Sequence, residues 1–161
     1  MQVRSAVVTE ADALAQLWFD GWQDAHAAIL PATLRRLRTL ENFKERLLRG
    51  LAEMHVVGPV GTPLGFCMLK EDEVHQLFVS AQARGTGVAT ALMSDAEARL
   101  AEKGVETAWL SCAIGNDRAA RFYKKSGWHN TGEYLTQVET TTGPFNLELW
   151  RFEKRLATAA R

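Results

Sequence analysis

A glycine-rich turn between a strand and a helix is the feature that most constrains the fold of this chain. Residues 84–89, Arg-Gly-Thr-Gly-Val-Ala, separate the apolar run 74–79 from the helical stretch 90–103. The first N–H groups of a helix have no partner inside it, and the helix dipole adds partial positive charge there. Gly85 and Gly87 can adopt positive φ angles that let a ligand approach the backbone. Alone, the segment indicates either a phosphate-binding turn or a plain tight turn.

Two common nucleotide-binding motifs do not fit this turn. A Walker loop needs Lys and then Ser or Thr after its last glycine, whereas Gly87 is followed by Val88, Ala89 and Thr90. The dinucleotide fingerprint needs Gly or Ala where Thr90 stands, and an acidic residue closing the next strand, which ends near residues 112–115. A nucleoside triphosphatase and a nicotinamide enzyme are therefore both disfavoured.

The turn resembles the acetyl-coenzyme A motif of the GNAT-type N-acetyltransferase superfamily, written Arg/Gln-x-x-Gly-x-Gly/Ala. Arg84, Gly87 and Ala89 match this motif, and Gln82, Gly85 and Gly87 match it in a second register. We prefer the first register because Arg-Gly-x-Gly-Val-Ala is the fuller match.

A second family element follows the first along the chain. Residues 116–128 are similar to the pattern Asn-x-x-Ala-x-x-Phe-Tyr-x-x-x-Gly-aromatic. The resemblance covers roughly residues 3–155 and is strongest over 73–128. It implies an α/β (α+β) fold of three layers, in which helices flank a central mixed β-sheet.

Local patterns predict the element order βααβββαβαββ in one domain, residues 1–156, with a loose C-terminal tail at 157–161. We expect strands at residues 3–8, 54–57, 64–70, 73–79, 105–113, 128–138 and 144–153. We expect helices from a capping box at 9–12 to Pro31, at 33–48, at 90–103 before Gly104, and at 117–126 after an Asn116 cap.

Composition argues against several classes of partner. The 19 basic and 19 acidic residues balance, so neither nucleic acid nor an anionic membrane is expected as a partner. Cys67 and Cys112 lack metal-ligand spacing, so we expect buried, reduced thiols and no metal. The chain shows no signal-peptide core and no apolar run long enough to span a membrane, so a cytoplasmic location is expected.

The family resemblance implies where acetyl-coenzyme A would bind. Its pyrophosphate would lie on the backbone of the turn, and acetyl-pantetheine would enter between two splayed strands with facing edges at 77–79 and 111–113. A main-chain N–H near Val79 would bind the thioester carbonyl. The expected coenzyme-binding residues are Leu77, Phe78, Val79, Gln82, Arg84, Gly85, Thr86, Gly87, Val88, Ala89, Thr90, Asn116, Ala119 and Tyr123. Asn116 is equally explained as a helix cap alone.

Tyr123 is the candidate general acid. A phenol with a pKa of about 10 is protonated at neutral pH and can donate to a thiolate whose conjugate pKa is about 8.5. Beside Phe122, Tyr123 also fits a plain packing role, and its place in the family pattern favours function.

Glu73 and His75 are the candidate general bases. Glu73 lies eleven residues before Arg84, where several family members carry a catalytic glutamate, and His75 shares its strand face. Two polar residues at a solvated strand end explain the pair equally well. His26, His55 and His129 have weaker claims.

The first helix carries the candidate acceptor-binding residues. In the family, this helix and its following loop form part of the acceptor pocket. Asp20, Asp24 and His26 would then favour a cationic amine, whereas Trp18 and Trp22, one turn apart, fit a core better than a substrate cage.

The leading functional prediction is an N-acetyltransferase that moves the acetyl group of acetyl-coenzyme A to a primary amine of a small molecule or peptide by direct attack in a ternary complex. The alternative is a non-catalytic acyl-coenzyme A sensor or binding module on the same fold. An acetyltransferase acting on charged transfer RNA would need a basic stripe, which the neutral balance disfavours. The acceptor and the oligomeric state cannot be read from the sequence, although family members often pair through their closing strands, which allows a homodimer.

Overall fold

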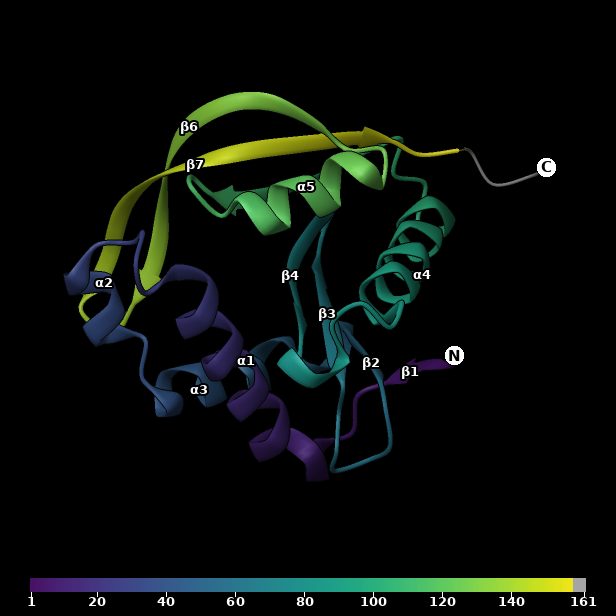
Figure 1. Cartoon of the computed structure of the whole chain (residues 1–161), viewed down its shortest axis with the longest axis horizontal. Coiled ribbons are helices and arrows are strands. Elements are labelled where there is room, and N and C mark those ends of the chain that lie inside the picture. The colour runs from purple at the N-terminus through teal and green to yellow at the C-terminus, as the bar shows by residue number, and fades with distance from the viewer. Residues whose placement is uncertain (158–161) are drawn as a thin grey trace.

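The computed structural model of the chain describes residues 1–157, so the expected tail lies, beyond Ala157, outside the described residues. One mixed sheet of seven strands runs through the molecule in the order β1-β2-β3-β4-β5-β7-β6 (Figure 1). The strands are β1 (Val3–Ser5), β2 (Met54–Val57), β3 (Gly65–Lys70), β4 (Glu73–Val79), β5 (Thr107–Ala113), β6 (His129–Thr140) and β7 (Gly143–Arg155). Neighbours pair antiparallel except β4 and β5, which are parallel.

The helices form the two outer layers. They are α1 (Ala11–His26), α2 (Ala32–Leu37), α3 (Leu40–Gly50), α4 (Val88–Glu102) and α5 (Asp117–Lys125). Figure 1 shows α1, α2 and α3 on one side of the central strands β3 and β4, and α4 on the other. The predicted fold class, a mixed sheet flanked by helices, is therefore confirmed. Within residues 1–157 no helix combines the length and the apolar character needed to cross a bilayer.

The single helix predicted at 33–48 is wrong, because the chain forms α2 and α3 there, separated at Arg38 and Thr39. The Thr39 hydroxyl accepts a hydrogen bond from the Asn42 N–H at 3.1 Å and so begins a new helix. The element order becomes βαααβββαβαββ. The apolar spacing on the two sides of the break continues, which is why periodicity alone suggests one helix.

The start of α1 is set by Glu10, not by the capping box predicted at residues 9–12. The Glu10 carboxylate, which is buried, accepts from the Val7 N–H at 3.0 Å and from both terminal nitrogens of Arg4 at 2.7 and 2.8 Å. The Gly61 N–H also points to it at 3.4 Å. One carboxylate thus joins β1, α1 and the β2–β3 turn, and β1 ends at Ser5 instead of residue 8.

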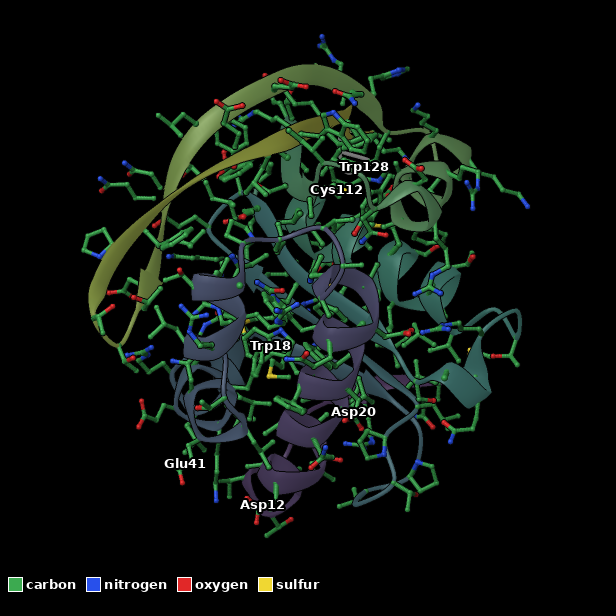
Figure 2. The ribbon with its side chains drawn as sticks, turned by 60° about the vertical axis from the view of Figure 1, so that its left-hand side comes forward. Asp12, Trp18, Asp20, Glu41, Cys112 and Trp128 are labelled. Carbon is green, nitrogen blue, oxygen red and sulfur yellow. The ribbon has the colours of Figure 1, made fainter. Side chains whose placement is uncertain are left out.

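Two hydrophobic cores pack on opposite faces of the sheet. Trp18 of α1 contacts Phe43 of α3 and Phe66 of β3, with ring centroids 5.0 and 5.8 Å away. The other core lies under α4 and α5 and includes Cys112 and Trp128. Figure 2 shows Trp18 among the first helices, and Cys112 and Trp128 together in the upper part of the molecule. Both cysteines are buried and free, as predicted.

A β-bulge in β4 separates it from β5. Gln76 pairs with Met68 and Val74 with Leu69, so His75 is an extra residue with no partner on β3. The only β4–β5 pair is Glu73 with Trp109. Beyond this pair the two strands diverge, in agreement with the splayed strands that the family resemblance implies.

We predict that Glu10→Gln lowers the free energy of unfolding by about 2 kcal/mol, because it removes the charge that holds Arg4. Arg4 lowers the pKa of Glu10. The ionic stabilisation is therefore fully present above the unfolded-state pKa of about 4.3 and is lost as pH falls through the lower folded-state value.

Urea unfolding between pH 3 and pH 7 measures this difference. Glu45→Gln is the matched control, because Glu45 is exposed and makes no ion pair with residues 1–157. Equal stability of the Glu10→Gln variant and the wild type at pH 7 would contradict the assignment.

Candidate active site

The divergence of β4 and β5 opens a cavity of about 330 Å³. Its walls come from β4, β5, α1, α5 and the turn before α4. The structure brings ten of the predicted site residues to this wall: His75, Leu77, Phe78, Val79, Arg84, Gly85, Ala89, Asn116, Ala119 and Tyr123. We refer to it below as the inter-strand cavity.

The start of α4 presents free backbone donors beside this cavity. Gly85 and Gly87 have φ angles of +75° and +90°, and Gly87 occupies the position before the helix. The Ala91 N–H donates to the Gly87 carbonyl at 3.0 Å, so the N–H groups of residues 87–90 precede the helical ladder. Main-chain donors of this kind can bind an anion.

The remaining predicted turn residues lie around this helix start, outside the cavity wall. Gln82, Thr86 and Thr90 are exposed, and the Thr86 hydroxyl donates to the Ala83 carbonyl. The Val88 side chain is buried in the core, so only its main chain can face a ligand.

Asp24 of α1 links two arginines at the mouth of the cavity. Its carboxylate accepts a hydrogen bond from Arg84 of the turn and approaches Arg118 of α5 at 3.4 Å. The hydrogen bond from Arg84 lowers the pKa of Asp24. Arg118 is a site residue that the sequence analysis missed, although it lies inside the second family pattern.

Tyr123 of α5 lines the inter-strand cavity. It packs against Phe122 and Phe152, with ring centroids 5.8 and 5.5 Å away, and Cys112 lines the same cavity. Burial raises the pKa of Tyr123, so its phenol stays protonated well above neutral pH. Burial also raises the pKa of Cys112 to about 12, so this thiol is not a nucleophile at neutral pH.

Asn116 caps α5. Its side-chain oxygen accepts from the Ala119 N–H at 3.3 Å, as the capping prediction required. Since Asn116 also lines the cavity, its side-chain amide can still act as a donor there.

A second cavity, of about 570 Å³, adjoins the first. It lies between α1 to α3 on one side and β4 to β7 on the other, and we call it the helix-side cavity. The two cavities share five residues: His26, His75, Gln76, Ser111 and Ala113. The two cavities therefore adjoin at these residues.

The two candidate bases meet at this junction. Glu73 lines the helix-side cavity, and its Oε1 lies 3.3 Å from the His75 Nδ1 without the alignment of a hydrogen bond. The Glu73 side chain is 12% exposed, so it is largely shielded but not isolated from solvent. Glu73 and His75, two polar residues at a strand end, thus form a partly buried carboxylate–imidazole pair.

His26, at the end of α1, also lies at the junction. Its ring contacts Trp22 and Phe78 edge to face, with centroids 5.2 and 6.4 Å away. Burial lowers the pKa of His26 to about 4, so its imidazole is neutral at pH 7. His55 instead pairs with Asp95 at 2.7 Å, away from both cavities.

The other candidate residues of α1 differ in whether they line a cavity. Trp18 belongs to the core, and Trp22 lies at the boundary of the core and the helix-side cavity. Asp20 accepts a hydrogen bond from Gln16 and lines neither cavity; Figure 2 shows it beside α1. No group of three or more metal-ligating side chains gathers within residues 1–157.

A match to a protein-family model identifies the family of this chain. The model of the acetyltransferase (GNAT) family matches residues 12–128, which include both cavities' β4 and β5 walls. The chain belongs to the GNAT acetyltransferase family. The predicted family resemblance is therefore confirmed.

Individual relatives agree with this assignment. An uncharacterized N-acetyltransferase of Mycobacterium tuberculosis is 35% identical over 77 residues, 45% of this chain, and the chain spans about half (49%) of the length of that relative. A GCN5-related N-acetyltransferase of Rhodopseudomonas palustris has a similar structure, with a TM-score of 0.74, 20% identity and 96% and 95% of the two chains covered. The PaiA N-acetyltransferase of Thermoplasma acidophilum in complex with coenzyme A is also similar, with a TM-score of 0.71 and 17% identity. The match covers 96% of this chain and 98% of that one.

Proposed function

We propose that this GNAT family member transfers an acetyl group from acetyl-coenzyme A to a primary amine of a small molecule or peptide, by direct attack in a ternary complex. The observation that carries this proposal is the meeting of two cavities where β4 and β5 diverge. One cavity begins at an anion-binding turn and the other opens to the helices, so donor and acceptor can be bound together.

The turn before α4 suits the pyrophosphate of the coenzyme. The free N–H groups of residues 87–90 and the nearby Arg84 and Arg118 supply the donors. Asp24 already binds both arginines, so a pyrophosphate would displace or share this carboxylate. The similar PaiA structure holds coenzyme A, which supports a coenzyme on this fold.

The strands supply the reaction centre. The Ser80 N–H donates to the carbonyl of Leu64, the residue just before β3. Because N–H groups alternate along a strand, that of Val79 would face the gap. It would stabilise the oxyanion while the amine nitrogen forms a bond to the carbonyl carbon. When the carbon–sulfur bond breaks, Tyr123 would give its proton to the thiolate. Desolvation of the same cavity raises the proton affinity of both anions, which preserves their match.

The amine has to lose a proton on the acceptor side. Glu73 would take it, with His75 beside it as a partner or a second base. His26 is a weaker candidate because its lowered pKa makes its imidazole a poor proton acceptor.

A non-catalytic acyl-coenzyme A module remains the alternative. The helix-side cavity and the protonated Tyr123 favour catalysis, because a binding module needs neither. A screen of amines, polyamines, aminoglycosides, amino acids and N-terminal peptides for thiol release from acetyl-coenzyme A separates the two: binding with no release from any acceptor would favour the module.

We predict that Gly87→Val weakens acetyl-coenzyme A binding more than tenfold, or by about 1.4 kcal/mol. Valine is strained at a φ of +90° and would shift the donor groups of the turn. Gly104→Val is the matched control, because Gly104 has a φ of +86° and an equally open surrounding at the other end of α4. Calorimetry should find normal affinity in the control only, and equal affinities in the two folded variants would refute this site.

We predict that Tyr123→Phe lowers kcat about 100-fold and changes coenzyme affinity little, because it removes the proton donor and keeps the packing ring. Tyr134→Phe is the comparison, since Tyr134 lines only the helix-side cavity. Single-turnover kinetics isolates the chemical step. Near-normal turnover of the Tyr123 variant in that step would exclude this role.

We predict that Glu73→Gln lowers kcat/KM and removes the rise of kcat/KM with pH that a general base produces, without loss of coenzyme binding. Glu71→Gln, in the turn just before β4, removes another carboxylate from the wall of the helix-side cavity and should keep the wild-type pH profile. Rates with a strongly basic amine test this best, because such an amine is least neutral at pH 7. Identical pH profiles of the wild type, Glu73→Gln and His75→Gln would leave neither residue as the base.

A further inference from the structure

Two arginines form an unusual part of the helix-side cavity wall. Arg38 lies between α2 and α3, is 4% exposed, and donates to the Asn42 side chain at 3.1 Å. Arg46 of α3 stacks its guanidinium over the Trp18 ring, 4.5 Å from the ring centroid. Both line the helix-side cavity, and neither lines the inter-strand cavity.

These guanidinium groups lack counter-ions. Among residues 1–157, no carboxylate lies within 4.0 Å of either group, and the buried Nη1 of Arg46 has no hydrogen-bond partner. Glu139 lines the same cavity and attracts both groups, but its carboxylate is exposed and lies within 4.0 Å of neither. Buried charges in folded proteins are normally paired, so two adjacent unpaired arginines indicate a charge that a ligand completes.

The pKa shifts of the two arginines agree with this geometry. Burial lowers the pKa of Arg46 to about 9 and that of Arg38 to about 10, and the charge of Arg38 further lowers the pKa of Arg46. The two positive charges therefore destabilise each other in a shielded place. An anion bound between them would offset both penalties.

The opposite end of the same cavity has the opposite character. Glu73 and His75 lie at the junction with the inter-strand cavity, where the amine must meet the thioester. A ligand that fits both ends carries an amine at one end and an anionic group at the other. Arginine suits a carboxylate there because its planar fork matches the two oxygens.

We infer that the acceptor is a small zwitterionic molecule, an amine that also carries a carboxylate, with the carboxylate bound by Arg38 and Arg46. The inference rests on the proposed acetyltransferase function and assigns the substrate class of that site. The carboxylates of α1 do not argue against it, because Asp20 lines neither cavity and Asp24 is held by Arg84 and Arg118.

The test compares α-, β- and γ-amino acids with their carboxamides, which keep the amine and lose the negative charge. Thiol release from acetyl-coenzyme A should give a kcat/KM at least tenfold higher for the best acid than for its amide. Arg46→Met and Arg38→Gln should reduce this acid-to-amide ratio about tenfold, and Arg46→Lys, which keeps the charge but not the fork, should reduce it less.

Arg36→Met is the matched control, because Arg36 is exposed, lies two residues from Arg38 and lines neither cavity. Its ratio should equal that of the wild type. Calorimetric affinity for acetyl-coenzyme A shows that each variant is folded and binds the donor.

The outcomes separate the two proposals. Three results would overturn the zwitterion inference and leave the acetyltransferase function intact. These are equal acetylation of amides and acids, an acid-to-amide ratio that no arginine variant changes, and turnover confined to peptides. Absence of turnover with every amine would overturn the proposed function instead. In that case, the affinities for N-acetylglycine and N-acetylglycinamide are compared with coenzyme A present. A preference for the acid that Arg46→Met abolishes would support the anion site. Equal binding of the two would overturn it.

Discussion

The bulge at His75 is the constraint on which the rest of the structure depends. It lets β4 pair with β3 along its whole length while it leaves β5 after the single pair Glu73–Trp109. A parallel pair of strands in the middle of a sheet normally uses all its hydrogen bonds, since unsatisfied buried donors destabilise a fold. Here the facing edges remain open, and a ligand with amide groups can supply the missing partners.

The two cores hold this gap open from opposite sides. Gly21 lets α1 approach β4 so closely that an added Cβ would lie 2.6 Å from the Phe78 ring. On the other face, α4 packs mainly on β3 and β4, in a core that also contains Trp128 and residues of β5. Because each helix layer is anchored independently, the Asp24 link between Arg84 and Arg118 can be exchanged for a ligand without disturbing either core.

Features governed by local sequence could be predicted, and features governed by distant contacts could not. The glycine turn, the Asn116 cap and the left-handed Gly104 follow from residues within one turn of each other. The start of α1 depends on Arg4 holding Glu10, and no pattern inside residues 9–12 reveals that contact. Ten of the predicted site residues line the inter-strand cavity, and six of these lie in the two local motifs. The helix-side cavity was missed because its wall combines segments from α1 to β7 that have no shared motif.

The net charge of the whole chain does not reveal the electric field inside the helix-side cavity. Nineteen acidic residues balance nineteen basic ones, which argues against a global attraction for polyanions. A cavity, however, responds to the few charges in its wall, because low-dielectric surroundings shield them less than water does. Arg38 and Arg46 lie on the helix side of this wall, and Glu73 lies at the junction with the inter-strand cavity. A neutral protein can therefore present an uneven field inside one cavity, and in the proposed reaction this field would orient a zwitterion with its amine toward the thioester.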